Sequence, residues 1–257
     1  MNIHIIKLGG RVATDESVLK TFLREASKLP EEDGLVIVHG GGAEVSQLSQ
    51  TLGHAPRFID GVRMTTPEEM PVVDMVLAGK MNKYIVRLGF AAGLDAVGVS
   101  GCDGGLFTGG SIAPGNRTGK ISRVNPRLLS TLIEKGFTPV VSSVSMDDNG
   151  DALNINADEA ALAVAKAMKA VTLVYISDIP GVLHEEKVIP YLDGASIDMH
   201  IAQGTISGGM VPKVRSAFDA VKNGVQAVII GGYGSDGDLG SLLSKTRGTA
   251  IVEKVGQ

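Results

Sequence analysis

Two lysines stand beside glycines where a phosphate group could bind. Lys7 precedes Gly9-Gly10 at the end of an apolar run, and Lys213 follows Gly208-Gly209 in the first turn of an expected helix. Such glycines leave backbone N–H groups open to an anion, at the positive end of the next helix. A lysine is disfavoured in that first turn, and a bound phosphate would supply the missing electrostatic reason. Taken alone, Lys7 is more simply explained as a lysine that reaches solvent.

A second glycine turn follows the apolar run that ends at Val38-His39. Gly40, Gly41 and Gly42 lose much entropy on folding and pack nothing, whereas an ordinary strand-to-helix turn needs one glycine. They therefore predict a close approach of the backbone to a ligand. Two such turns, with a lysine before the first, indicate sites for a phosphate and a second anionic group, which favours phosphoryl transfer.

Further polar residues could bind a substrate. Arg63 can pair with a carboxylate through two parallel hydrogen bonds, although a surface arginine explains it at least as well. Asn154, Asn156 and Asp158 alternate with apolar residues, which places them on one face of an extended segment. Asp158 by itself is expected to be a helix N-cap. The clustering of the three nevertheless favours a polar site.

Several other motifs are set aside. Residues 232–237 fit the dinucleotide pattern G-x-G-x-x-G, but only twenty residues follow, too few for the rest of that unit. Residues 115–120 resemble a P-loop with one residue too few. Cys102 has no local signature of a nucleophile, and we expect a small core residue there.

The elements that must position these residues alternate between strand and helix, as in a mainly parallel α/β sheet. Residues 104–124 and 146–152 are expected to form hairpins. Thr66 to Glu69 match a capping box with Pro67 at the first helical position, and Pro71 predicts a kink or a later helix start. Expected strands cover 3–8, 35–39, 96–100, 138–143, 171–177 and 225–230. Expected helices cover 15–28, 43–52, 74–92, 126–135, 158–169 and 211–223.

Composition narrows the function classes. The chain has 257 residues, 44% of them hydrophobic, 4% aromatic and none Trp, as expected for a covered parallel sheet built from aliphatic residues. The net charge of −4 gives no reason to expect nucleic acid or an anionic membrane as partner. No signal-like or 18-residue apolar segment stands out, so we expect a cytoplasmic protein. A single cysteine excludes an intrachain disulfide and, with scattered histidines, argues against a zinc site.

Taken together and in order, six motifs that span nearly the whole chain resemble the amino-acid kinase family. They lie at residues 5–10, 38–42, 61–65, 154–158, 177–183 and 208–213. The resemblance implies an αβα sandwich with a mainly parallel central sheet, formed by a single domain over 1–257. Within it, residues 1–170 are expected to bind the substrate and residues 171–257 to bind ATP.

Within the family, the motifs are closest to the members that phosphorylate N-acetylglutamate in arginine biosynthesis. There the γ-carboxylate of the substrate attacks the γ-phosphate of ATP, giving an acyl phosphate and ADP, and catalysis consists of positioning and charge neutralisation. The resemblance makes Lys7 and Lys213 the cations at the transferring phosphoryl group, with Asp158 holding them in place. It assigns phosphate to Gly9, Gly10 and Gly40, and the acyl substrate to Gly41, Gly42, Arg63 and Asn154. It assigns ATP to Asp178, Ile179, Pro180, Gly181, Val182, Leu183, Thr205, Ile206 and Ser207.

The resemblance also implies that Mg²⁺ enters with ATP and is held by phosphates and water, without metal ligands from the protein. The chain begins two residues before its first expected strand, without the helical arm that forms arginine-sensing hexamers. We therefore expect a homodimer that is insensitive to arginine.

Two alternatives stay open. Residues 53–58 and 99–104 are closer to relatives that phosphorylate a carrier-bound aminoadipate or glutamate in lysine or ornithine biosynthesis. Residues 116–120 add positive charge that could meet an acidic carrier protein, whereas residues 61–65 favour acetylglutamate. Other amino-acid kinases, such as aspartate, carbamate or uridylate kinase, fit these motifs less well. A non-catalytic sensor is disfavoured because both lysines are present.

Overall fold

The protein is described here by a computed structural model that covers residues 1–30, 32–59 and 61–255, with only the backbone of Gly10 and Arg11. The chain forms two compact units, one from residues 1–35 and 164–257, the other from residues 36–163. The first 35 residues thus group with the C-terminal part of the chain. Which unit binds ATP and which binds the substrate, expected from a division near residue 170, stays a prediction.

The first unit contains a mixed, mainly parallel arrangement of strands. Strand β11 (Thr172–Ser177) lies between β1 (Asn2–Leu8) and β15 (Ala227–Gly232), and all three are parallel. Strand β16 (Thr249–Ile251) is antiparallel to β15, and β14 (Tyr191–Leu192) is parallel to β16. The three central strands are almost entirely buried, which explains their near-continuous runs of Val, Ile and Leu.

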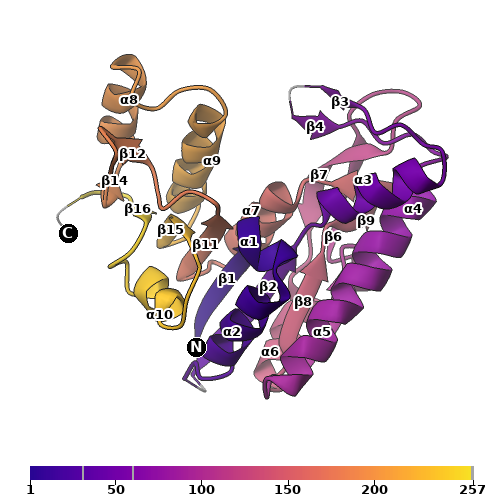
Figure 1. The fold of residues 1–257 in the computed structure, drawn as a ribbon, viewed down its shortest axis with the longest axis horizontal. Helices are drawn as coiled ribbons and strands as arrows, with labels where there is room; N and C mark the ends of the chain where they lie inside the picture. The colour runs from indigo at the N-terminus through magenta and orange to yellow at the C-terminus, as the bar shows by residue number, and fades with distance from the viewer. Residues whose placement is uncertain (31, 60, 256–257) are drawn as a thin grey trace. The chain divides into compact units, whose positions relative to one another are not determined.

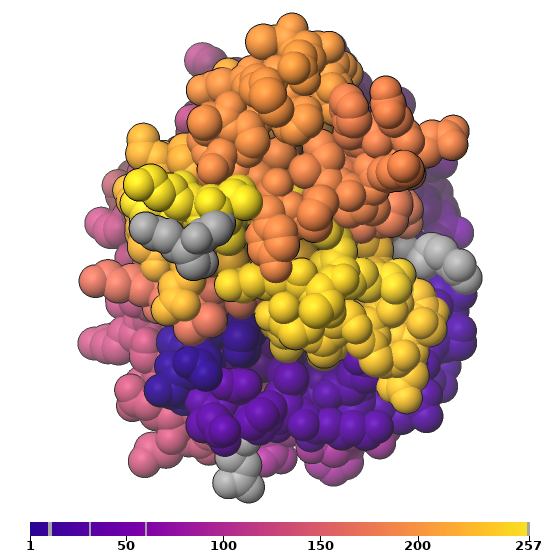
Figure 2. Space-filling view, turned by 90° about the vertical axis from the view of Figure 1, so that its left-hand side faces the viewer, coloured from indigo at the N-terminus to yellow at the C-terminus, as the bar shows by residue number. Residues whose placement is uncertain are grey.

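The remaining elements of this unit are helices and one short hairpin. Figure 2 shows the residues after β11 gathered on one face, in orange and yellow. The helices are α1 (Gly10–Thr14), α2 (Glu16–Ala26), α8 (Gly194–Ala202), α9 (Met210–Lys222) and α10 (Asp238–Leu243), and the hairpin pairs β12 (Leu183–His184) with β13 (Lys187–Val188).

The second unit has a parallel group and a small barrel (Figure 1). Strand β8 (Thr138–Ser142) lies between β2 (Asp33–His39) and β5 (Ala96–Ser100), all parallel. Strands β6 (Phe107–Ser111), β7 (Thr118–Val124), β9 (Val144–Met146) and β10 (Ala152–Ile155) close into a four-stranded barrel. The antiparallel pairs β6–β7 and β9–β10 confirm both expected hairpins. A short antiparallel pair, β3 (Phe58–Ile59) and β4 (Val62–Arg63), precedes the helical run that begins at Met70.

Helices complete the second unit, and one of them corrects an expectation. The helical run begins at Met70 rather than near Asp74, with Pro71 in its first turn, where a proline removes an N–H that has no intrahelical partner. The run passes through a π-helical segment, η1 (Met75–Met81). The helices are α3 (Gly42–Thr51), α4 (Met70–Asp74), α5 (Asn82–Ala91), α6 (Arg127–Glu134) and the start of α7 (Ala157–Ala167), and a 3₁₀ turn, η2, covers Asp103–Gly105.

The six expected strands and the α/β class with mainly parallel strands are confirmed. Within the described part of the chain, no helix is both long enough and apolar enough to span a membrane.

Candidate functional site

In the first unit, both predicted lysines lie next to the same tyrosine. Lys7 is the register partner of Tyr175 in the parallel pair β1–β11, so the two side chains lie on the same face of the strands. The Nζ atom of Lys213 lies 5.1 Å from the centre of the Tyr175 ring, a cation–π contact. Tyr175 is buried and both lysines are half-buried. Tyr175 was not predicted from the sequence, because a tyrosine within an apolar strand is equally well explained by core packing.

The turn after β1 needs a glycine for packing. A Cβ on Gly9 would lie 2.5 Å from the carbonyl oxygen of Ile176 and 2.9 Å from Lys7 Nζ. The first contact involves backbone of the neighbouring strand, which cannot move aside cheaply. Gly9 therefore lets β1 end close to β11 and keeps the Lys7 ammonium beside the turn, while Gly10 begins α1.

The two segments predicted to bind ATP lie close to each other in this unit. The Thr249 hydroxyl accepts the N–H of Val182 at 2.8 Å, and a Cβ on Gly181 would lie 2.8 Å from the same oxygen. His184 Nδ1 lies 3.1 Å from Thr205 Oγ1, which joins β12 to residues 205–207 just before α9. His184 directly follows the predicted segment 178–183 and was missed.

In the second unit, the triple-glycine turn is supported by a buried histidine. His39 Nδ1–H donates to the Gly40 carbonyl at 2.8 Å, and His39 Nε2 accepts from Asn82 Nδ2 at 3.2 Å. Burial lowers the pKa of His39 to about 4, outweighing the Gly40 hydrogen bond, which raises it. The ring is therefore neutral at pH 7 and fixes the first carbonyl of the turn.

The three glycines of this turn have different surroundings. A Cβ on Gly41 would meet the buried side chains of Leu77 and Met81 at 2.9 and 3.1 Å, so the fold itself restricts this position. A Cβ on Gly42 would meet no described atom within 4 Å. Gly42 is thus the glycine whose open space a ligand could use.

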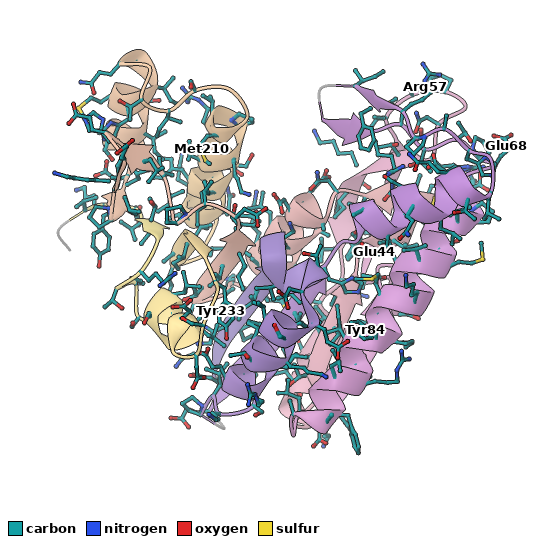
Figure 3. All side chains as sticks on the ribbon, in the orientation of Figure 1. Glu44, Arg57, Glu68, Tyr84, Met210 and Tyr233 are labelled. Carbon is teal, nitrogen blue, oxygen red and sulfur yellow. The ribbon has the colours of Figure 1, made fainter. Side chains whose placement is uncertain are left out.

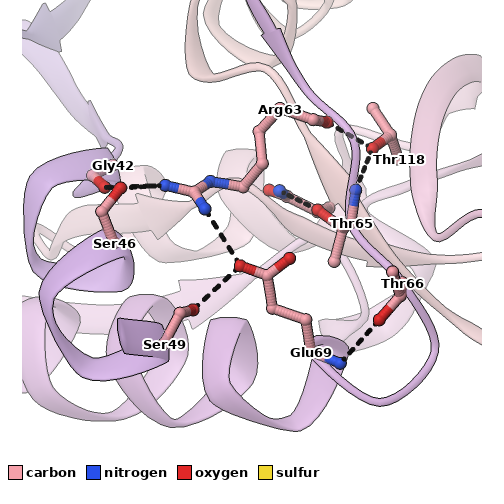
Figure 4. Close-up of polar contacts among 9 residues, drawn as sticks. Gly42, Ser46, Ser49, Arg63, Thr65, Thr66, Glu69 and Thr118 are labelled. Atoms are coloured by element: carbon pink, nitrogen blue, oxygen red, sulfur yellow. Dashed lines mark hydrogen bonds and ion pairs between the residues drawn. The ribbon is translucent and has the colours of Figure 1, made fainter. Parts of the chain in front are cut away.

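Arg63 is buried, which excludes the surface arginine that the sequence left open. Its Nη1 donates to Glu69 Oε1 at 3.0 Å, and its Nη2 donates to the Gly42 carbonyl at 3.1 Å and to the Ser46 hydroxyl (Figure 4). The Phe58 ring covers one face of the guanidinium at 4.8 Å. Arg63 thus joins strand β4 to the glycine turn and to helix α4.

Asn154 lies close to Arg63 through two threonines. Its Nδ2 donates to Thr65 Oγ1 at 2.8 Å. Thr118 Oγ1 accepts the N–H of Thr65 at 2.9 Å and donates to the carbonyl of Arg63 at 2.5 Å. The structure therefore brings the predicted Arg63, Asn154, Gly41 and Gly42 into one region of the second unit. Glu69, Ser46 and the two threonines were missed.

The expected arrangement of Asn154, Asn156 and Asp158 on one extended face is wrong. Strand β10 ends at Ile155, and α7 begins at Ala157. Asn156 Oδ1 accepts the N–H of Asp158 at 2.8 Å, so Asn156 is the N-cap and Asp158 lies in the first helical turn. The default role of Asp158 as the cap is therefore also wrong.

The rejected dinucleotide motif is explained by its own loop. Asp238 Oδ2 accepts the N–H groups of Gly234 and Ser235 at 2.9 and 3.0 Å. The backbone donors that would hold a pyrophosphate are thus already bound.

Burial raises the pKa of the half-buried Cys102 thiol, which disfavours a thiolate nucleophile.

The described part of the chain contains no group of three or more His, Cys, Asp or Glu that could hold a metal ion. The candidate groups of the first unit include two lysines and backbone amides. Those of the second unit include the Arg63 guanidinium, which is paired with the Glu69 carboxylate, and neutral polar groups.

Comparison with known proteins gives a consistent family. The sequence profile of the amino acid kinase family matches residues 2–232. The acetylglutamate kinase of Geobacillus kaustophilus is 41% identical over 229 residues, 88% of this chain and 88% of that protein. The acetylglutamate kinase of Methanoculleus marisnigri is 38% identical over 237 residues, 86% of this chain and 82% of that protein.

A crystal structure from Streptococcus mutans has a TM-score of 0.78 at 27% identity and covers 98% of this chain and 99% of its own. The carbamate kinase of Giardia has a TM-score of 0.69 at 15% identity, with 98% and 99% covered, and shares the fold.

Proposed function

The chain belongs to the amino acid kinase family, and from this premise we propose that it transfers the γ-phosphoryl group of ATP to the γ-carboxylate of N-acetylglutamate. The observation that carries the proposal is the placement of Lys7 and Lys213 beside one buried tyrosine, next to a glycine turn. Two ammonium groups so placed suit a phosphoryl group that gains charge on its oxygens. The named relatives, acetylglutamate kinases at about 40% identity, supply the acceptor.

The reaction needs no base from the protein. The γ-carboxylate is already ionised at pH 7, and one of its oxygens attacks the γ-phosphorus in line. A new bond forms between that oxygen and phosphorus, the bond from phosphorus to the β,γ-bridging oxygen breaks, and ADP leaves with that electron pair. Lys7 and Lys213 stabilise the charge that shifts onto the phosphoryl and ADP oxygens. In this proposal, Asp158 orients the lysines rather than moving a proton.

The second unit supplies groups for the acyl substrate. Arg63 pairs with the α-carboxylate, and Asn154 hydrogen-bonds the acyl amino acid. The N–H groups of Gly41 and Gly42 face the reacting end. Gly9, Gly10 and Gly40 bind phosphoryl oxygens, and residues 178–183 and 205–207 bind the nucleotide.

ATP is a substrate in this proposal, and Mg²⁺ accompanies it. Among the described residues, no group of three or more His, Cys, Asp or Glu could hold a metal ion. In the proposal, the ATP phosphates and water hold the ion. We place the enzyme in arginine biosynthesis in the cytoplasm, as a homodimer, which light scattering would test by its mass.

The first experiment measures ADP release with ATP and Mg²⁺ against a panel of acceptors. The panel contains N-acetylglutamate, glutamate, aspartate, carbamate and aminoadipate derivatives, including one bound to a carrier protein. We expect turnover with N-acetylglutamate alone. Turnover only with the carrier-bound compound would move the enzyme to the alternative that the named relatives do not support, and nucleotide binding without turnover would indicate a sensor.

A further inference from the structure

Glu69 is a buried carboxylate beside the candidate substrate arginine. The exposed fractions of the Arg63 and Glu69 side chains are 8% and 4%, and their closest atoms, Nη1 and Oε1, are 3.0 Å apart. Ser49, which is fully buried, donates its hydroxyl to the same Oε1 at 2.8 Å. A buried carboxylate without such partners would be costly, so the arrangement indicates that this charge is kept for Arg63.

The local sequence explains how Glu69 reaches Arg63. Thr66 Oγ1 accepts the N–H of Glu69 at 3.2 Å, which forms one half of the expected capping box. In the other half, a carboxylate would return to the backbone of Thr66. The Glu69 carboxylate instead binds Arg63 and Ser49, as Figure 4 shows. The turn before α4 therefore forms only half of a capping box, because the Glu69 carboxylate binds the Arg63 guanidinium instead of the Thr66 backbone.

The contacts of Arg63 leave one edge for a ligand. Glu69 binds Nη1 only, while Nη2 contacts the Gly42 carbonyl and the Ser46 hydroxyl. The Nε–H has no partner among the described residues. A carboxylate that pairs with an arginine side-on uses Nε and Nη2, the edge away from Glu69. Such a ligand replaces one neutral acceptor at Nη2 and leaves the bond to Glu69 intact.

We propose that Glu69 is a positioning residue that holds Arg63 with its Nε–Nη2 edge toward the α-carboxylate of the acyl substrate. This inference rests on the proposed function for the identity of that substrate. Glu69 itself touches no substrate in this account. Its effect is therefore limited to ligands that carry the α-carboxylate.

The test is isothermal titration, without ATP, of three compounds against the wild type, Glu69→Gln and Glu68→Gln. The compounds are N-acetylglutamate, its γ-amide, which keeps the α-carboxylate, and its α-amide, which lacks it. Glu68 is the adjacent, exposed residue and gives a matched control (Figure 3). We expect Glu69→Gln to weaken the binding of N-acetylglutamate and of the γ-amide about tenfold, because the variant loses one charge-assisted hydrogen bond to Arg63. Binding of the α-amide and all values for Glu68→Gln should stay within about twofold, the usual range for an exposed site.

Equal binding of the γ-amide by the wild type and Glu69→Gln, or tighter binding by the variant, would overturn the inference. The same weakening of all three compounds would show a merely structural role and would also overturn it. If Glu69→Gln does not fold, Ser49→Ala, which removes only one bond to Glu69, should give the same pattern at smaller size.

The two proposals can fail separately. A wild type that binds the γ-amide but forms no acyl phosphate would remove the proposed function and leave the role of Glu69 intact. A wild type that binds none of the three compounds would remove both.

Discussion

The two units hold their candidate functional cations in different ways. In residues 36–163, the guanidinium of Arg63 is buried, paired with a carboxylate and bonded at both Nη atoms. In the other unit, Lys7 and Lys213 are half-buried, and the Lys213 ammonium lies over an aromatic ring. A rigid clamp suits the end of a substrate that does not react. In the proposed reaction, the two ammonium groups instead meet the phosphoryl group, where charge shifts during transfer.

The largest expected effect comes from removing the clamp. Arg63→Ala leaves Glu69 buried without its cation, and we expect the free energy of unfolding to fall by about 3–5 kcal/mol. Urea denaturation at pH 7 measures this loss, with Arg57→Ala as the exposed control from the same region (Figure 3). Arg63→Leu combined with Glu69→Leu should recover most of the stability but not the binding of acetylglutamate. A stable Arg63→Ala single variant would contradict the buried-pair account.

Lys213→Ala tests the proposed role of the lysines in the first unit. We expect kcat to fall about 10²–10³-fold, the usual effect of removing one group that stabilises transition-state charge, with a smaller change in the KM of either substrate. Steady-state ADP release measures both constants. Lys222→Ala, in the last turn of the same helix, should behave as the wild type. An unchanged kcat would remove Lys213 from the mechanism.

The buried His39 predicts a dependence of stability on pH. Above pH 6.5, the histidine is neutral in both the folded and the unfolded chain and contributes nothing. Between pH 6.5 and about 4, the unfolded chain binds a proton that the folded chain does not, because burial lowers the folded-state pKa to about 4. The free energy of unfolding therefore decreases as pH falls, by up to about 3 kcal/mol from this residue.

The measurement compares denaturation of the wild type and His39→Gln from pH 7 to pH 4. The variant should lose stability less steeply, whereas His184→Gln, at an exposed histidine, should follow the wild type. Parallel curves for the wild type and His39→Gln would contradict a buried neutral ring.

The smallest expected effects are those of single alanine substitutions in the two glycine turns, which should differ in their loss of unfolding free energy. Gly9→Ala places a Cβ against a backbone carbonyl, and we expect a loss of about 1–3 kcal/mol in unfolding free energy. Gly42→Ala meets no described atom within 4 Å, so its stability should stay within about 0.5 kcal/mol of the wild type. In the proposed mode of binding the acyl substrate uses that space, so Gly42→Ala should raise the KM for acetylglutamate. An unchanged KM for Gly42→Ala would assign the open space to solvent.

The sequence predicted the long elements and the residues at their ends, because hydrophobic periodicity and glycine turns are local signals. It predicted Arg63 as a candidate but could not separate a buried arginine from an exposed one. Glu69 was missed because the capping box already explained its position, and only the fold brings its carboxylate to Arg63. Asn156 rather than Asp158 caps α7, because the helix begins at Ala157, one residue before the expected start at 158.

Trapping of the product with hydroxylamine tests the central claim most directly. The wild type is incubated with ATP, Mg²⁺, N-acetylglutamate and hydroxylamine, and mass spectrometry identifies which carboxyl group becomes a hydroxamate. We predict the γ-hydroxamate in equal amount to ADP, because in the proposed mechanism Arg63 binds the α-carboxylate and leaves the γ-carboxylate to react. ADP without a hydroxamate, or the α-hydroxamate, would contradict it.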